Sequence, residues 1–211
     1  MSELESPTAA QTKPPRRRMA PMDRRQDLLA AAITCLAQLG PKGATGREIC
    51  RQAGVSHGLL RHYFENPETL FLEAYKDLCE RFLAEFERLL AANDPDPWRT
   101  LDRFFAVLYS ETWTGPEVLG AWTAFWTLTR NDPAFAEVNA AHNRGLQDLL
   151  AEAVGRLPVK GRDDVDREQV LLIIAALMDG LWLEFSLRPD AAKRAQAVEL
   201  CNLTLRRLLV A

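Results

Sequence analysis

The fold of this chain is decided by the stretch Ala44-Thr-Gly-Arg-Glu-Ile-Cys-Arg-Gln-Ala-Gly-Val-Ser-His-Gly-Leu-Leu-Arg-His-Tyr-Phe64. Its pattern predicts a short helix over 45–53, a tight turn at Gly54-Val55, and a second helix over 56–64. Six apolar side chains are spaced so that both helices can pack against a preceding helix over 23–39: Ile49, Ala53, Val55, Leu59, Leu60 and Phe64. This pattern predicts a helix-turn-helix motif, in which the second helix enters the major groove of DNA by its N-terminal residues.

The polar residues of this motif are candidates for DNA contact. The second helix would present five of them to the major groove: Ser56, His57, Gly58, Arg61 and His62. Gly58 has no side chain and so allows a close approach of the backbone to DNA. At the start of the first helix, Thr45 and Arg47 can reach phosphates through helix-terminal N–H groups and a guanidinium. The alternative is a generic helical hairpin with a charged, solvated face.

The charge distribution supports the DNA-binding interpretation. Residues 13–65 contain ten Lys and Arg against four Asp and Glu, a net charge of +6, whereas residues 66–211 carry −7. A basic head on an acidic body is typical of a nucleic-acid-binding protein with a separate, non-binding domain. Residues 1–20 are polar and proline-rich and end in a basic run, which predicts a disordered arm. This arm is either a solvated tail or a segment that reaches DNA.

The rest of the chain shows helical periodicity with almost no strand signal. We predict an all-α protein of about nine helices, with the later ones over 67–92, 97–112, 116–131, 133–156, 164–188 and 190–209. The predicted organisation is an arm over 1–20, a helix-turn-helix domain over 21–66, and a ligand-binding and dimerisation domain over 67–211. Prolines near the helix boundaries fit this division.

Several classes of protein are excluded. The four cysteines are scattered without a CxxC pair or a histidine cluster, which argues against a zinc site or a disulfide framework. The sequence has no nucleophile elbow, P-loop or metal-ligand spacing, so we expect neither an enzyme nor a bound cofactor. No uninterrupted apolar run is long enough to span a bilayer, and the N-terminus has no signal-peptide core. These features predict a cytoplasmic protein without a membrane partner.

An aromatic cluster in the second half is the candidate ligand site. Trp122, Phe125 and Trp126 follow helical i, i+3, i+4 spacing and would form one stripe, which is either core or the wall of a pocket. Asp179 follows nine apolar residues, so we expect it to be buried or half-buried, paired with a local donor or with a bound cation. Indole faces attract organic cations. The candidate ligand-binding residues are Tyr109, Trp113, Trp122, Phe125, Trp126, Asp179 and Trp182.

The chain resembles the TetR/AcrR family of transcriptional regulators. The resemblance rests on Ala53-Gly-Val-Ser56, Gly58, His62-Tyr-Phe64 and Leu70. It implies that His62 and Tyr63 contact the DNA backbone. It also implies that the last two helices form a four-helix seam in a homodimer, which binds a palindromic double-stranded operator.

The chain departs from the family pattern at two positions. Arg61 stands where many members have tyrosine, and Pro67 where many have lysine. The phosphate contact of that lysine is therefore missing, and Arg61 is a candidate to replace it.

Within the family, the chain looks most like the choline-responsive (BetI-like) repressors of glycine-betaine synthesis. The motifs are Ser56-x-Gly58 with His62-Tyr-Phe64, Ala124-Phe-Trp126, and Met178-Asp-Gly-Leu-Trp-Leu183. This resemblance implies a repressor released from DNA by choline or betaine aldehyde. As a hypothesis from the predicted architecture, the long fourth helix links the ligand pocket to the helix-turn-helix motif. Two alternatives remain: a TetR-like regulator of an unrelated apolar or aromatic ligand, and a helical ligand-binding adaptor that does not bind DNA.

Overall fold

The computed structural model describes residues 21–157, 166–188, 190 and 192–210, which contain ten helices and no β-strand. The predicted arm over 1–20 lies outside these residues. The all-α prediction is confirmed. In chain order the helices are α1 (Pro21–Gly43), α2 (Gly46–Ala53), α3 (His57–Tyr63), α4 (Pro67–Ala91), α5 (Pro97–Leu108), α6 (Glu111–Thr114), α7 (Pro116–Thr129), α8 (Pro133–Gly155), α9 (Arg167–Leu187) and α10 (Ala192–Leu209).

Local signals place the ends of the first three helices. The Thr45 and Ser56 hydroxyls each accept a hydrogen bond from the backbone N–H three residues later, at 3.3 Å. Gly54 ends α2 with φ at 63°, a left-handed conformation that favours glycine. Gly40, with φ at 66°, interrupts the helical path of α1 where the sequence predicted an end at 39.

One predicted helix is divided in the structure. The helix expected over 97–112 ends at Leu108, and the four-residue helix α6 follows it. Tyr109 leaves the helical path, and Ser110 takes an extended conformation at the start of α6. This division accounts for the tenth helix.

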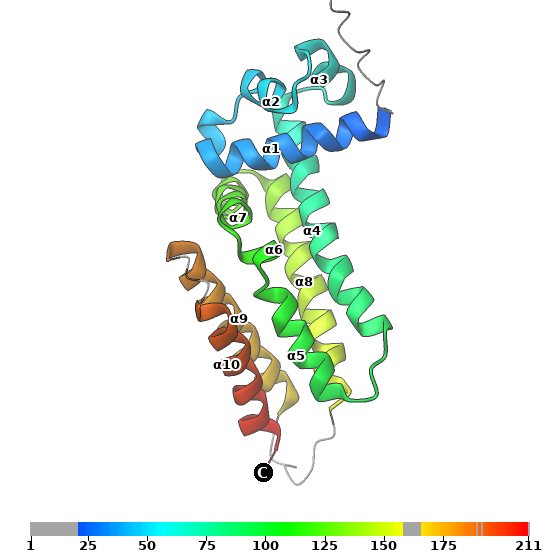
Figure 1. Cartoon of the computed structure of the whole chain (residues 1–211), viewed down its shortest axis with the longest axis vertical. Coiled ribbons are helices and arrows are strands. Elements are labelled where there is room, and N and C mark those ends of the chain that lie inside the picture. The colour runs from blue at the N-terminus through cyan, green and yellow to red at the C-terminus, as the bar shows by residue number, and fades with distance from the viewer. Residues whose placement is uncertain (1–20, 158–165, 189, 191, 211) are drawn as a thin grey trace, which may run out of the picture.

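The helices form an elongated molecule with the helix-turn-helix motif at one end (Figure 1). α4 and α8 pack side by side along the long axis, while α9 and α10 pack together at the end far from α3. The interior is rich in aromatic rings. Phe86 of α4 lies 4.4 Å from Phe104 of α5, and Tyr75 of α4 stacks on Phe125 of α7 at 4.5 Å between ring centroids. These contacts hold α4 in the centre of the molecule.

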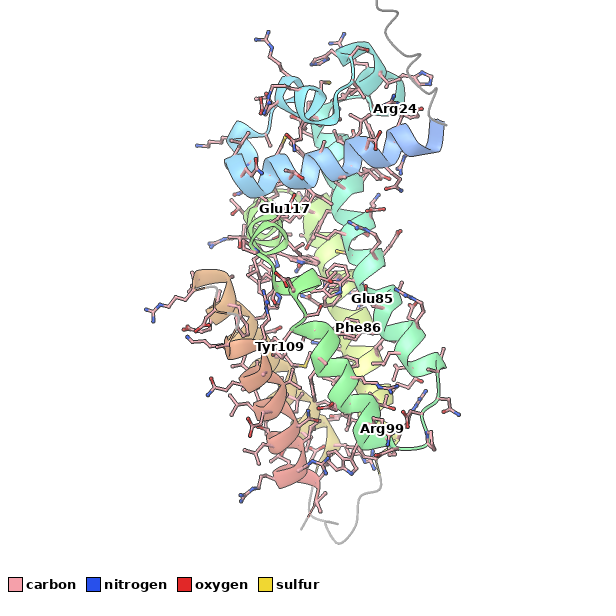
Figure 2. All side chains as sticks on the ribbon, viewed as in Figure 1. Arg24, Glu85, Phe86, Arg99, Tyr109 and Glu117 are labelled. Atoms are coloured by element: carbon pink, nitrogen blue, oxygen red, sulfur yellow. The ribbon has the colours of Figure 1, made fainter. Side chains whose placement is uncertain are left out.

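The helix-turn-helix end of the molecule, which we call the reader (α1–α3), is joined to the remaining helices by a close contact of α1 with α7. Figure 2 shows Glu117 of α7 beneath α1, where it accepts a hydrogen bond from the Thr34 hydroxyl at 2.5 Å. A Cβ atom added to Gly120 of α7 would lie 3.0 Å from the backbone oxygen of Ala37 and 3.2 Å from its Cα. The two backbones can therefore approach this closely because position 120 has no side chain. The predicted domain boundary at residues 66/67 stays a prediction, because α1 packs against α2, which precedes the boundary, and against α4 and α7, which follow it.

The sequence analysis found no uninterrupted apolar run long enough to span a bilayer, but helix α9 passes a test of length and average composition for such a segment. It is long and apolar enough to cross a membrane by length and composition, with a mean hydropathy of 2.0, although core helices of soluble proteins pass the same test. Asp179 and Glu184 interrupt its apolar sequence, which is why no uninterrupted run signalled it. In this chain α9 packs against α7, α8 and α10, and 28% of its most apolar 18-residue window is buried.

The α1–α7 contact predicts a position-specific effect of glycine replacement. Gly120→Val should lower the free energy of unfolding by about 1–3 kcal/mol, because the new side chain meets the backbone of α1. Gly155→Val is the matched control, since a Cβ at Gly155 meets no atom within 4 Å. Urea unfolding of both variants measures the difference, and equal losses would contradict the close contact.

Candidate functional site

The predicted DNA-reading residues lie together on α2 and α3, at the end of the molecule (Figure 1). Seven of the eight are exposed, and Tyr63 is half-buried with its ring edge against His62, at 5.1 Å between centroids. The exposed residues are Thr45, Arg47, Ser56, His57, Gly58, Arg61 and His62. Their role in DNA contact stays a prediction, but the fold brings them together at the same end of the molecule.

The charged side chains of this surface differ in how they are engaged. Among the described residues, neither Arg47 nor Arg61 forms a salt bridge, whereas Arg51 pairs with Glu48. The Arg51 guanidinium lowers the pKa of the Glu48 carboxyl through this hydrogen bond. Arg47 and Arg61 can therefore turn to phosphates without breaking an ion pair in the described part of the chain.

Two features that hold the reader in place were missed by sequence reasoning. Arg25 of α1 pairs with Glu73 of α4 at 3.2 Å and lies 5.5 Å above the ring of Phe64, which joins the end of α3 to both helices. Gly46 leaves room for the His57 imidazole, whose Nε2 lies 3.3 Å from where a Cβ atom of residue 46 would be. Neither pairing has a local sequence signal.

Four of the seven predicted ligand residues line one cavity enclosed mainly by α4, α7, α8 and α9. They are Trp122, Trp126, Asp179 and Trp182, and the remaining wall is formed by Phe82, Leu108, His142, Asn143, Leu146 and Met178. The rings of Trp126 and Trp182 lie 5.0 Å apart with a 56° interplanar angle. The cavity volume is about 70 Å³. That is far below the roughly 300 Å³ at which ligand pockets begin, so a ligand must displace its walls.

The other three predicted ligand residues are in the core and do not line this cavity. Phe125 stacks on Tyr75, and the Trp113 Nε1 donates to Glu85 at 3.0 Å. The Tyr109 hydroxyl lies 3.3 Å from the carbonyl oxygen of Met178, on the side of α5 that faces α9 and α10 (Figure 2). Burial raises the pKa of this phenol strongly. Their aromatic character serves packing rather than the cavity.

Asp179 is more exposed than the sequence suggested. We expected it to be buried or half-buried, but it is exposed in the single chain because only one side of α9 is covered. The apolar surroundings nevertheless disfavour its charged form and raise the pKa of its carboxyl. Within the described residues it has no salt-bridge partner, so its charge is available at the edge of the cavity.

His142 is a cavity residue that the sequence analysis did not identify. Its side chain is 8% exposed, with its ring centroid 5.0 Å from Trp122 and 5.2 Å from Phe82. Desolvation lowers the pKa of the imidazole to about 4, so it is neutral at neutral pH. Its Nδ1 is buried without a hydrogen-bond partner in the described part of the molecule. A histidine alone on its helix gave no pattern that could have found it.

Comparison with known proteins identifies the family. Residues 28–74 match the model for bacterial regulatory proteins of the tetR family, and residues 97–210 match the C-terminal model of the BetI-type transcriptional repressor. The chain belongs to the TetR family. Its C-terminal part is of the BetI type, and it is a transcriptional repressor. The family is one of transcriptional regulators rather than of enzymes.

Sequences and structures of related proteins align with this chain over most of its length. The HTH-type transcriptional regulator BetI of Serratia proteamaculans is 32% identical over 84% of this chain and 88% of its own. That of Klebsiella pneumoniae is 29% identical over 92% and 98%. Among solved structures, a transcriptional regulator from Pseudomonas aeruginosa PAO1 matches with a TM-score of 0.80 at 30% identity, covering 92% of this chain and 94% of its own. The structure of a regulator from Saccharomonospora viridis in complex with choline shares the fold, with a TM-score of 0.76 at 18% identity over 90% and 99%.

The buried neutral imidazole of His142 predicts a pH-dependent stability. Because the folded-state pKa of about 4 lies below the ordinary 6.5, the unfolded chain takes up the proton first as the pH falls. Stability should therefore fall between pH 6.5 and 4, and about 2 kcal/mol of this loss should appear between pH 7 and 5.

The variant His142→Phe isolates this contribution, since other groups titrate in both proteins. Its free energy of unfolding, measured in urea at pH 7 and pH 5, should decrease less than that of the parent. An equal decrease in the free energy of unfolding of the two proteins would contradict the prediction, because it would show that folding does not lower the pKa of His142.

Proposed function

We propose that this TetR-family repressor acts as a homodimer on a palindromic operator and is released by a choline-like quaternary ammonium cation. The observation that carries the proposal is the cavity in which Trp126 and Trp182 lie 5.0 Å apart beside Asp179. The BetI-type match over 97–210 supports the same ligand class.

The lining of the cavity suits a cation of this type. The quaternary head group of choline has four carbon substituents on its nitrogen. It is large, weakly hydrated and unable to donate an N–H hydrogen bond, so it is held by indole faces rather than by polar groups. Trp122, Trp126 and Trp182 provide three such faces, and the Asp179 carboxylate provides the opposite charge. No lysine or arginine is among the described lining residues, so the field in the cavity favours a cation. The choline complex of the Saccharomonospora viridis regulator adds support for this chemistry.

A homodimer explains the apolar surface of the last two helices. Large apolar side chains are exposed on both, with 71% exposure at Leu172 and 70% at Leu187. The others are Ile173, Leu183, Leu200 and Leu203. A surface of this kind on one face marks a protein interface. Two-fold pairing through α9 and α10 would place two copies of α3 about 34–36 Å apart, as a palindromic operator requires.

Two helices connect the cavity with the reader. α4 carries Phe82 at the cavity and Glu73 at the pair with Arg25. α7 carries Trp122 and Trp126 at the cavity and packs against α1 at Gly120. Because the cavity is smaller than a ligand pocket, a bound ligand must move its walls, and this movement would change the distance between the two copies of α3 in the dimer. The ligand shifts the equilibrium between the DNA-binding and the released conformation only through its differential affinity for them. The proposed connection between cavity and reader thus includes α7 as well as α4.

We place the repressor activity in the cytoplasm, where the operator and effector meet.

DNA binding should depend on the two arginines of the helix-turn-helix motif that form no salt bridge with another described residue. Arg47→Ala and Arg61→Ala should each weaken binding to an operator selected in vitro, and each should reduce the slope of log affinity against log salt by about 1. Arg81→Ala is the control, since Arg81 lies on α4 and pairs with Asp77 at 2.9 Å. Fluorescence anisotropy at several salt concentrations measures both quantities. A chain that binds no DNA in this assay would instead be a ligand-binding adaptor.

Ligand binding should depend on positive charge and on the cavity indoles. Choline should quench tryptophan fluorescence at saturation, and its uncharged isostere 3,3-dimethylbutanol should bind much more weakly. Trp126→Leu and Trp182→Leu should each raise the Kd for choline about 5- to 30-fold, which corresponds to about 1–2 kcal/mol. Trp98→Leu is the control, since Trp98 lies on α5 against Arg206 and away from the cavity.

The same titration should depend on pH. Protonation of Asp179, whose pKa is raised, removes the opposite charge, so choline affinity should fall as the pH is lowered through that pKa. Asp179→Asn should bind more weakly and lack this pH dependence. Equal binding of choline and its isostere would indicate an apolar pocket and a different ligand.

A further inference from the structure

The cavity contains a second kind of recognition element besides its cation-binding groups. Its ring contacts fall into two groups: Trp126 with Trp182, and His142 with Trp122 and Phe82. The Asp179 carboxylate is the acidic group of the lining, and His142 is its deeply buried polar residue. A ligand that spans the cavity would therefore meet charge and indole faces together with one buried hydrogen-bonding group.

His142 has an unused hydrogen-bonding capacity. Its Nδ1 is one of two buried side-chain nitrogen or oxygen atoms without a partner in the described residues. The other is the Oδ1 of Asn202, whose amide nitrogen already donates to Asp102 and to the carbonyl oxygen of Val198. A buried polar group without a partner costs free energy, and such groups are usually satisfied by protein, water or ligand. The orphaned atom of His142 belongs to a residue in the wall of the cavity.

The protonation state of His142 fits a neutral polar partner. Desolvation holds the pKa of the imidazole near 4, so at neutral pH the ring carries no charge that would repel a cation. A neutral imidazole has one N–H donor and one acceptor nitrogen. It can donate to a hydroxyl oxygen or accept from a hydroxyl hydrogen, and it satisfies its own orphaned atom by doing so.

We propose that His142 binds the hydroxyl group of the ligand and makes the cavity selective for a hydroxyalkyl quaternary ammonium over the same cation without a hydroxyl. This inference rests on the proposed function, since it needs the cation at the indoles and Asp179. It adds that one end of the ligand is read by charge and the other by a single hydrogen bond. A site built to bond a hydroxyl rejects the analogue that lacks it, because its own polar group is then left unpaired.

The test compares choline with propyltrimethylammonium, in which a methyl group replaces the hydroxyl. The parent protein should bind choline about tenfold more tightly, as expected for the loss of one buried hydrogen bond. In His142→Leu, the Kd for choline should rise about tenfold while that for propyltrimethylammonium changes little. His142→Gln, which keeps a donor and an acceptor, should recover part of the preference.

Asn202→Leu is the matched control, since the Oδ1 of Asn202 is the other buried atom without a partner in the described residues, but Asn202 does not line the cavity. It should keep the preference for choline. Circular dichroism and operator binding verify that each variant is folded, and the ligand comparison in the parent protein stands even if one variant does not fold. Equal affinity of the parent for both cations would overturn the role of His142, as would equal weakening of both by His142→Leu or loss of the preference in Asn202→Leu. Failure of both cations to bind the parent would refute the cation site itself, so the two failures are distinguishable.

Discussion

The close packing of α7 against α1 is the constraint on which communication along this molecule depends. At Gly120 the two helix backbones approach so closely that one added carbon would lie 3.0 Å from the carbonyl oxygen of Ala37. Two helices packed this closely move together, because a displacement of one requires a displacement of the other. The same α7 carries Trp122 and Trp126 into the cavity wall. In the proposed function, a change in the cavity would reach α2 and α3 through this contact of α7 with α1.

The small size of the cavity gives this contact its functional meaning. A volume of about 70 Å³ leaves space for a few water molecules at most. Binding of a larger cation must separate indoles from α7 and α9, and the free energy for this displacement comes from cation–π contacts, from Asp179 and from the hydrogen bond we assign to His142. A site that needs rearrangement to bind its ligand links occupation to conformation, which is what a ligand-released repressor requires.

The sequence was most informative where the cause of structure is local. The helix starts at Thr45 and Ser56, the turn at Gly54 and the end of the first helix near residue 39 depend on a few neighbouring residues, and the structure has all four. The lining of the cavity was harder to predict, because helical spacing does not tell which side of a helix faces a cavity. Phe125 and Trp126 are about 100° apart around α7. One of them packs on Tyr75 and the other on Trp182. The pairing of Arg25 with Glu73, the space at Gly46 for His57 and the position of His142 depend on contacts distant in sequence. The exposure of Asp179 in the single chain depends on which sides of α9 are covered by other helices, and the sequence pattern does not show this.

The central claim is that the cavity and the reader are linked, and operator affinity with and without choline tests it most directly. An operator selected in vitro with the parent protein is titrated by fluorescence anisotropy at fixed salt, first without ligand and then with saturating choline. The account predicts that choline weakens operator binding by at least about tenfold, which corresponds to a coupling free energy of about 1.4 kcal/mol or more. Choline that saturates the tryptophan signal while operator affinity stays unchanged would contradict it.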